Sequence, residues 1–313
     1  DIANTPNAIN RSYGIFAQEE FLLGNFMLTL GARYQNVATE AQSTPGWDVN
    51  GMDFDDDAFV GAVNLLYQIS PKFNLTGSFG TAFRAPSIVE RLFQGSTPEG
   101  SGFQILNPDL KSENSQNVDF GFKYMDRHTF ANLTVFRNEI EDGIIQYFLT
   151  DDEIGMLPPD IGIPEGEGDL FIVQKRNAER LEYEGIELAA GYRFDSGVSL
   201  GGNYTYIDGK RIDNTNPPTG DTFSDKLNLY ARYDAPSGRY WGEYRVRRNG
   251  EEDTNLDVNE PIPPIGETLP SFTVHRLGGG VVFNAGRMQH RLGLVVDNLT
   301  DELYAEFSNI TFF

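Results

Sequence analysis

The feature of the sequence that most constrains the fold is a repeated pair of alternating apolar and polar runs. A tight turn joins the two runs of each pair, and a long connection follows. In residues 73–79 the odd positions are Phe, Leu, Gly and Phe, and the even positions are Asn, Thr and Ser. Because successive side chains of a strand point to opposite faces, each such strand has one face suited to lipid and one suited to water. This rhythm occurs six times and is typical of a transmembrane β-barrel.

The pattern predicts twelve strands joined in pairs by short turns. Alternation is clear in residues 26–34, 61–69, 73–80, 117–124, 186–194, 198–206, 227–233, 240–246, 277–283 and 292–296, and weaker in 13–21 and 131–135. The turns lie at residues 24–25, 70–72, 126–127, 195–197, 236–238 and 285–287, which are rich in residues that favour turn dihedrals.

The longer connections predict an orientation for the barrel. They span residues 37–58, 84–112, 138–180, 208–222 and 248–270. Outer-membrane barrels have short turns on the periplasmic side and long loops outside. We therefore expect an all-β, antiparallel transmembrane barrel in the bacterial outer membrane, with extracellular long loops and periplasmic short turns.

Composition excludes several other classes of protein. The 46 Asp and Glu residues against 24 Lys and Arg give a formal charge of -22, which argues against binding to nucleic acid. The chain has no cysteine, so it forms no disulfides or thiolate metal sites. Its 39% hydrophobic content is too high for a disordered acidic chain, and no apolar run reaches the roughly 18 residues of a membrane helix.

A soluble β-sandwich, β-helix or propeller is the alternative for an acidic all-β chain. Two features favour the membrane. The longest alternating runs have nine residues, at the lower end of the roughly 9 to 11 that a tilted membrane strand needs, whereas strands of globular proteins average about 5 to 6. Aromatic residues also gather near strand ends, where an interfacial girdle would lie. They are Tyr67, Phe73, Phe83, Tyr124, Tyr192, Phe194, Tyr233 and Tyr240.

Four segments resemble landmarks of TonB-dependent outer-membrane receptors. Residues 80–87 (GTAFRAPS), with ERLF at 90–93, are similar to the "FRAPS" segment of that family through Phe83, Arg84, Ala85 and Pro86. Residues 107–115 (NPDLKSENS) are similar to its "NPxLKPExS" segment through Asn107, Pro108, Leu110 and Glu113. Residues 297–304 resemble its "NLxDxxY" segment through Asn298 and Leu299. Asn177, followed by residues 185–187, resembles a further landmark between them. We expect these motif residues to be structural.

The resemblance implies a larger barrel than this chain contains. Barrels of the family have about 22 strands and a plugged lumen, so residues 1–313 would form the C-terminal part of the barrel, without the plug domain. The segment after Tyr304 lacks the family's "PGR" turn, and Asn309 and Thr311 alternate poorly before Phe313. The last strand would then be missing as well. The alternative is a self-contained barrel of twelve strands, since outer-membrane barrels of even strand number exist.

The same resemblance implies a function in active transport. It suggests uptake of a scarce ligand, most often a ferric siderophore, with energy from the TonB complex acting through the part that this chain lacks. Haem, cobalamin and oligosaccharide are other ligands of the family, and a passive porin or adhesin is the alternative for a small barrel. The chain has no recognisable catalytic motif, so we expect no enzyme and no cofactor. The expected partners are the ligand, TonB, and the lipid and lipopolysaccharide of the membrane.

One group of polar residues is a candidate ligand site on the lumen side. It comprises Tyr230, Arg232, Trp241, Arg245 and Arg247, which share the polar register of two strands. The guanidinium fork suits anions such as an iron chelate and stacks on aromatic rings. The same side chains could instead pair with lumen carboxylates such as Glu243 or with a plug.

Histidines and acidic clusters give weaker signals. Residues 87–106, where haem receptors of the family carry a histidine, contain none, and His128, His275 and His290 suit ordinary wall positions. Acidic runs at residues 48–57 and 151–169 do not fit the ligand spacing of an EF-hand, so we predict no metal site. The long connection at 138–180 is a candidate lid, in which residues 144–149 would fold back as a hairpin on 171–173.

Overall fold

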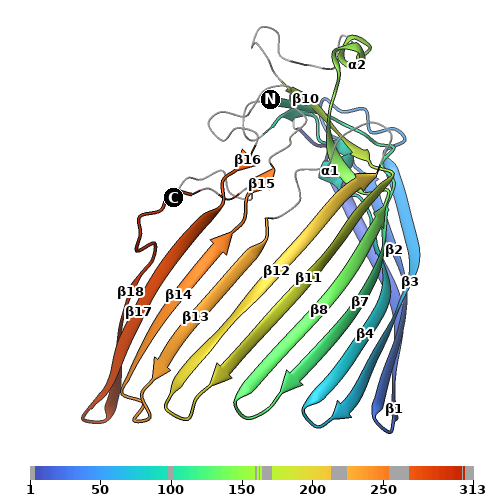
Figure 1. Cartoon of the computed structure of the whole chain (residues 1–313). Helices are drawn as coiled ribbons and strands as arrows, with labels where there is room; N and C mark the ends of the chain where they lie inside the picture. Colours follow the sequence, from blue (N-terminus) through green and yellow to red (C-terminus); the bar gives the residue numbers. More distant parts are fainter. Residues whose placement is uncertain are drawn as a thin grey trace.

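The structure is a computed structural model that describes residues 4–97, 102–158, 161, 163, 171–212, 224–253, 268–304 and 306. Most of the chain forms one antiparallel sheet that curves like the wall of a barrel (Figure 1). Its strands in spatial order are β1 (Ala8–Leu23), β2 (Phe26–Ala41), β3 (Asp53–Ser70), β4 (Phe73–Arg84), β7 (Glu113–Met125), β8 (Thr129–Glu141), β11 (Arg180–Arg193), β12 (Val198–Ile212), β13 (Lys226–Asp234), β14 (Tyr240–Asn249), β17 (Phe272–Ala285) and β18 (Met288–Val296). The predicted twelve strands and six tight turns are confirmed.

The strands are longer than the apolar alternation that predicted them. β3 has 18 residues and β1 and β2 have 16 each. The acidic run 53–57, predicted to lie in a loop, is the first part of β3 and pairs with residues 36–40 of β2. Backbone pairing continues there because charged side chains can point into water, so polarity marks the limit of the apolar band and not the end of the strand.

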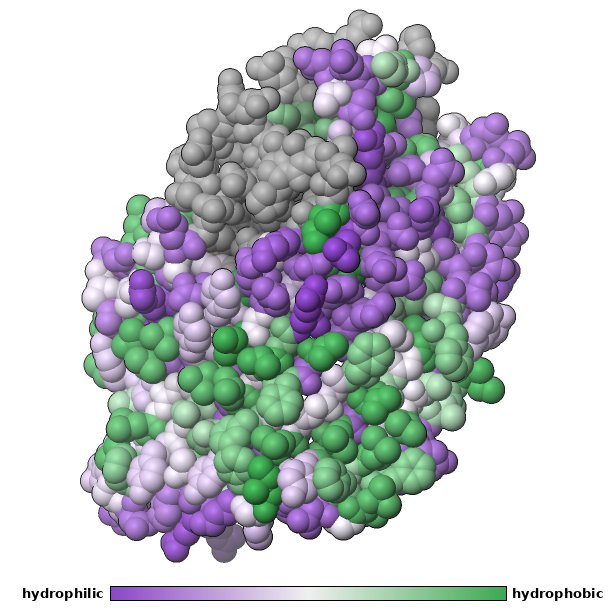
Figure 2. Space-filling view, turned by 45° about the vertical axis from the view of Figure 1, so that its right-hand side comes forward, coloured by the Kyte–Doolittle hydropathy of each residue, from purple (hydrophilic) through white to green (hydrophobic). Residues whose placement is uncertain are grey.

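The two faces of the sheet differ in polarity. Residues directly opposite each other on antiparallel strands share a face, and one face carries exposed apolar side chains such as Leu188, Leu200, Leu229 and Leu277. Figure 2 shows hydrophobic residues gathered in a band over the lower strands, with hydrophilic residues above it. Ring pairs lie at the short-turn ends, as at Phe26 and Tyr67 (4.4 Å) and Tyr192 and Phe194 (4.6 Å).

The short turns use the backbone conformations that such turns require. Gly24 and Gly286 have φ of 61° and 63°, in the left-handed region that favours glycine. The short turns all lie at one end of the strands (Figure 1). No described helix is long and apolar enough to cross a membrane.

A small head lies beyond the other end of the strands. It contains a second sheet of β5 (Gly95–Ser96), β6 (Gly102–Ile105), β10 (Phe171–Asn177) and β9 (Ile144–Phe148), in that order. The helices α1 (Ile88–Leu92) and α2 (Asp151–Gly155) belong to the same two loops. β15 (Glu252–Asp253) and β16 (Thr268–Leu269) form a separate two-stranded ladder.

The predicted hairpin in the long connection is present, because Phe148 of β9 pairs with Val173 of β10. The parallel pairing of β10 with β6 was not predicted. Phe103, Ile105 and Ile172 form the buried centre of the head. The expectation about Asn309, Thr311 and Phe313 lies outside the described residues, as does most of the acidic run after residue 158.

Candidate functional site

Strand register brings the five predicted ligand residues onto one face of the sheet. In β13 and β14, Tyr230 lies opposite Arg245, and Asp234 lies opposite Trp241. Arg232 lies opposite Glu243 between these pairs, and Arg247 follows one step nearer the head. This is the face opposite the exposed apolar residues, so it is the inner face of the wall. The structure nevertheless separates the five residues into a lower pair and an upper group.

The lower pair is Arg232 and Trp241, whose contacts are filled by neighbouring residues. The guanidinium carbon of Arg232 lies 4.7 Å from the centre of the indole ring. Arg232 donates to Asp234 at 2.8 and 2.7 Å and to Glu243 at 3.4 Å. On its other side, the indole lies against glycines of β17, since a Cβ at Gly280 would stand 2.7 Å from Trp241 Nε1. This geometry favours the structural alternative for both residues.

The upper group lines a cavity of about 510 Å³ between β12, β13, β14, β17 and the segment after β18. Three of the predicted residues are in it, namely Tyr230, Arg245 and Arg247. The other polar lining residues are Asn203, Asn228, Arg276, Asp297, Asn298 and Tyr304. The sequence singled out the last three as part of a family motif, but it indicated none of the six as a ligand residue. The lining of the cavity therefore contains three guanidinium groups and one carboxylate, that of Asp297, and its other residues are uncharged.

The three arginines differ in how firmly they are held. Arg245 Nε lies 2.6 Å from Glu243. Arg247 lies 2.7 Å from Glu306 and over the rings of Phe272 and Tyr304, at 5.2 and 5.4 Å from their centres. Arg276 Nε lies 3.3 Å from the Asp297 carboxylate, and both of these side chains are about half exposed or more (48% and 66%). Of the three ion pairs, that of Arg276 is the longest, and its carboxylate partner is the most exposed.

The third motif closes the cavity with local hydrogen bonds. Asn298 has a positive φ of 52°, and its side-chain amide donates to the Glu302 carbonyl at 3.0 Å and accepts from the Glu302 N–H at 2.9 Å. Leu299 N donates to the His275 carbonyl at 2.9 Å. These hydrogen bonds hold the segment after β18 against β17, where Tyr304 stacks on Phe272 with ring centres 4.4 Å apart.

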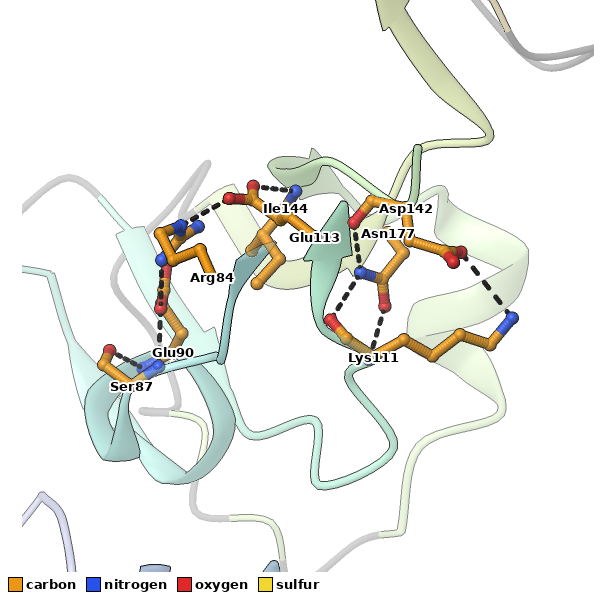
Figure 3. A network of polar contacts seen from close by, with 8 residues as sticks. All are labelled: Arg84, Ser87, Glu90, Lys111, Glu113, Asp142, Ile144 and Asn177. Atoms are coloured by element: carbon orange, nitrogen blue, oxygen red, sulfur yellow. Dashed lines mark hydrogen bonds and ion pairs between the residues drawn. The ribbon is translucent and has the colours of Figure 1, made fainter. Parts of the chain in front are cut away.

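The first motif forms a polar junction at the base of the head (Figure 3). Arg84 Nη1 lies 2.9 Å from Glu90, and Arg84 Nε is bound to Glu113. Ser87 caps α1 through a reciprocal capping box with Glu90. Burial raises the pKa of Glu90, but hydrogen bonds from the Ser87 N–H and from Arg84 outweigh it, and the net pKa lies below the ordinary value.

Arg91, which follows in the same motif, is a buried anchor. Its side chain is 4% exposed, it binds Asp56 of β3 at 2.8 and 2.9 Å, and it donates to the Leu110 carbonyl at 2.9 Å. Its guanidinium carbon lies 4.4 Å from the centre of the Phe54 ring. Arg91 thus fastens the loop between the two motifs to the barrel wall.

The histidines lie away from the cavity. His128 Nδ1 donates to the Arg193 carbonyl at 2.9 Å beside a short turn. His290 stacks on Phe283, and His275 Nδ1 contacts the Tyr244 hydroxyl at 2.6 Å. Within the described ranges, no group of three or more His, Asp or Glu side chains could hold a metal ion.

Comparison with known proteins assigns the family. The family model of the TonB dependent receptor-like β-barrel matches residues 2–299. The chain belongs to the TonB-dependent receptor β-barrel family. Its relatives include the heme/hemopexin utilization protein C of Haemophilus influenzae, 26% identical over 96% of this chain and 41% of the relative. Another is the ferrienterobactin receptor of Escherichia coli, 26% identical over 61% of this chain and 25% of the relative.

Solved structures of the family share the fold. The copper transporter OprC superposes with a TM-score of 0.73 at 19% identity, over 96% of this chain and 43% of OprC. The ferric citrate transporter FecA gives a TM-score of 0.68 at 15% identity, over 95% of this chain and 41% of FecA. This confirms a β-barrel of the TonB-dependent receptor type, and relatives of this chain are outer-membrane receptors and transporters, not enzymes. The chain spans less than half the length of these proteins.

Proposed function

We propose that residues 1–313 form the C-terminal part of the barrel of an outer-membrane receptor that binds a ferric siderophore and imports it with energy from TonB. The observation that carries this proposal is the three-arginine cavity on the inner wall of a TonB-dependent receptor barrel. Guanidinium groups beside phenols and amides suit a bulky chelate with several anionic oxygens. The contribution of the wall is selection of the ligand, not chemistry on it.

The free edges of the sheet support the larger barrel. Among the described residues, β1 pairs only with β2, and β18 pairs only with β17. A lipid environment has no water to satisfy unpaired backbone groups, so both edges need neighbouring strands in a membrane. The apolar band of the outer face would contact lipid, and the polar residues above it would contact lipopolysaccharide (Figure 2).

An extracellular position for the head and a periplasmic position for the short turns follow the usual arrangement of outer-membrane barrels, in which the short turns are periplasmic and the long loops extracellular. In that orientation the cavity lies on the inner wall nearer the extracellular end, because residues 228–230 of β13 and 245–247 of β14, which line it, are on the side away from the short turn between these strands. A ligand arriving from outside would meet the head and the cavity before the deeper lumen.

Haem is the second candidate ligand, because one relative is named for heme/hemopexin utilization. No described histidine lines the cavity, and His275 is on the opposite face of β17 from Arg276. Axial ligation of haem iron by this part of the wall is therefore not offered by the described residues, and an anionic iron chelate fits better.

The test is uptake by the full-length receptor in a bacterium that lacks its own iron receptors. In one arm, cells under iron limitation would receive radioactive iron as ferric enterobactin or as ferric citrate. In a parallel arm, they would receive haemin. We expect accumulation of one ferric chelate that stops when TonB is deleted. Accumulation of haemin alone would favour the second candidate, and uptake that persists without TonB would favour a passive pore.

A further inference from the structure

The four ends of the two long loops meet at one junction. The first loop leaves β4 at Arg84 and enters β7 at Glu113, and the second leaves β8 after Glu141 and enters β11 at Arg180. β4, β7, β8 and β11 are consecutive neighbours in the large sheet. Segments far apart in the sequence therefore leave the wall side by side, as Figure 3 shows.

Asn177 joins the second loop to the first through one side chain. Its amide nitrogen donates to the carbonyls of Lys111 (3.0 Å) and Asp142 (2.6 Å), and its amide oxygen accepts from the Lys111 N–H at 2.9 Å. Lys111 Nζ also lies 3.6 Å from the Asp142 carboxylate. A single amide thus satisfies three backbone groups that belong to two other chain segments.

Glu113 makes a second connection between the loops. One carboxylate oxygen binds Arg84, at the start of the first loop, and the other accepts from the Ile144 N–H at 2.7 Å, at the start of β9. Arg84 continues the chain of contacts to Glu90 in α1. All four loop ends are therefore linked through three side chains.

Above this junction the two loops share one small sheet and one core. β6 and β10 pair in parallel from Gly102 and Phe171 to Ile105 and Gln174. The Asn107 amide donates to the Lys175 carbonyl at 2.8 Å, and the Gln174 amide donates to the Leu106 carbonyl at 3.0 Å. Separation of the loops would break this ladder and expose the apolar core of the head at the same time.

We propose that Asn177 and Glu113 are positioning residues that couple the two loops into one body, which moves as a unit during ligand capture. This rests on the proposed receptor function. Independent closure of either loop would break the hydrogen bonds of Asn177 and Glu113, of which those to Asp142 and Ile144 are partly buried, and would separate β6 from β10. Movement of both loops together keeps all of these contacts.

Hydrogen exchange of the full-length receptor in lipid tests the coupling without any ligand. In the wild type, the amides of β6 and β10 should open together, with protection that agrees within a few-fold. Asn177→Ala should speed exchange in both strands by the same factor, about 10- to 100-fold for unsatisfied backbone groups. Asn132→Ala, in β8 below the junction, is the control and should change neither. Faster exchange in β10 with unchanged β6 would overturn the proposal.

A cross-link tests the coupling during transport. The chain has no cysteine, so a Gln104→Cys/Val173→Cys pair, which are register partners across the two loops, can be oxidised selectively. Neighbouring strands lie about 4.8 Å apart, within the range that a disulfide spans. The control pair Gln146→Cys/Lys175→Cys joins β9 and β10 inside one loop.

The probes are ferric enterobactin, ferric citrate and haemin. For each double-cysteine receptor, the rate of uptake with the disulfide formed should be within about twofold of the rate after reduction. Loss of uptake in the Gln104/Val173 pair alone, restored by reduction, would mean that the loops separate and would overturn the proposal. If no probe enters even with the wild type, the receptor function fails, while the exchange experiment still decides the coupling.

Discussion

At the residue scale, Arg91 is a buried cation whose partners come from two separate parts of the chain. It is 4% exposed and bonds to Asp56 in the wall and to the Leu110 carbonyl in the loop. Removal of one partner of a buried ion pair leaves an unpaired buried charge, which costs about 3–5 kcal/mol. Exposed pairs contribute about 0–1 kcal/mol.

We predict that Arg91→Ala frees the loop 84–112 while the strands stay paired. Limited proteolysis of the purified receptor should cleave this loop at least about 100-fold faster than in the wild type, as expected for a loss of that size. Arg11→Ala removes the exposed pair with Glu40 and should leave cleavage unchanged. Equal cleavage of the Arg91 variant and the wild type would contradict an anchoring role.

Arg276 and Arg232 are both arginines of the inner wall, but Arg232 is held by two carboxylates and an indole ring, whereas Arg276 lies 3.3 Å from one exposed carboxylate. Arg276→Gln should weaken binding of ferric enterobactin about tenfold or more, because a hydrogen bond to a charged group contributes about 1.5–3 kcal/mol. Arg232→Gln should change binding by less than about threefold, since Asp234, Glu243 and Trp241 already occupy its guanidinium. Quenching of protein fluorescence by the ferric chelate gives both dissociation constants. The reverse order of effects would move the ligand to the lower pair.

The pKa of Glu90 predicts an acid limit for the first loop. Burial raises this pKa, but the Ser87 N–H and Arg84 lower it more, so it lies below the ordinary value of 4.5 in the folded loop. A depressed pKa adds stability that is complete above 4.5 and is lost as the pH falls through the lower folded value. Protease resistance of the loop should be constant at neutral pH and decline below about pH 4.5, and Glu90→Gln should remove that decline. A decline that starts near pH 6 would point to another group.

At the element scale, the long strands and the β9–β10 hairpin were predictable from the sequence, and the rest of the head was not. A period of two is a local signal, so it also placed Tyr230 and Arg245 on one face, and the same alternation continued to Arg247. β6 has only four residues, and its partner β10 begins more than sixty positions later, beyond the reach of any local pattern. Arg276 was missed for a similar reason, because it joins the cavity only through its register opposite Arg245.

Glycines on the inner face let aromatic side chains lie flat against the neighbouring strand. A Cβ at Gly280 would stand 2.6 Å from the Leu292 carbonyl oxygen and 2.7 Å from Trp241 Nε1. Gly280→Ala should therefore lower the free energy of unfolding by about 1–3 kcal/mol, as other overpacking changes do. Gly31→Ala, in β2, meets nothing within 4 Å and is the control.

Urea unfolding in lipid vesicles, followed by tryptophan fluorescence, measures both variants. The fluorescence of Trp241 should also shift in Gly280→Ala, because the added methyl group displaces the indole. Equal stability of the two variants would mean that β17 and β18 separate easily to make room.

At the scale of the whole molecule, the assignment of an outer and an inner face governs both insertion and function. The apolar face is exposed along most of the wall, and charged residues that face the lumen alternate with it along each strand. In a soluble protein, a surface of this kind would bind another protein or aggregate. In a membrane it is the surface that lipid covers. Which of two successive strand residues faces lipid therefore affects the free energy of unfolding.

Two adjacent positions in the middle of β11 test the assignment of the outer and inner faces directly. Leu188 is on the apolar face, opposite Tyr204, and Glu187 is on the inner face, opposite Thr205. An arginine that faces the bilayer midplane destabilises a barrel by about 2–4 kcal/mol, whereas a lumen position faces water. Leu188→Arg should lower the free energy of unfolding in vesicles by that amount, and Glu187→Arg should change it by less than about 1 kcal/mol. Equal losses would contradict this assignment of the two faces, because successive residues of a strand point to opposite faces and only one of those faces would meet lipid.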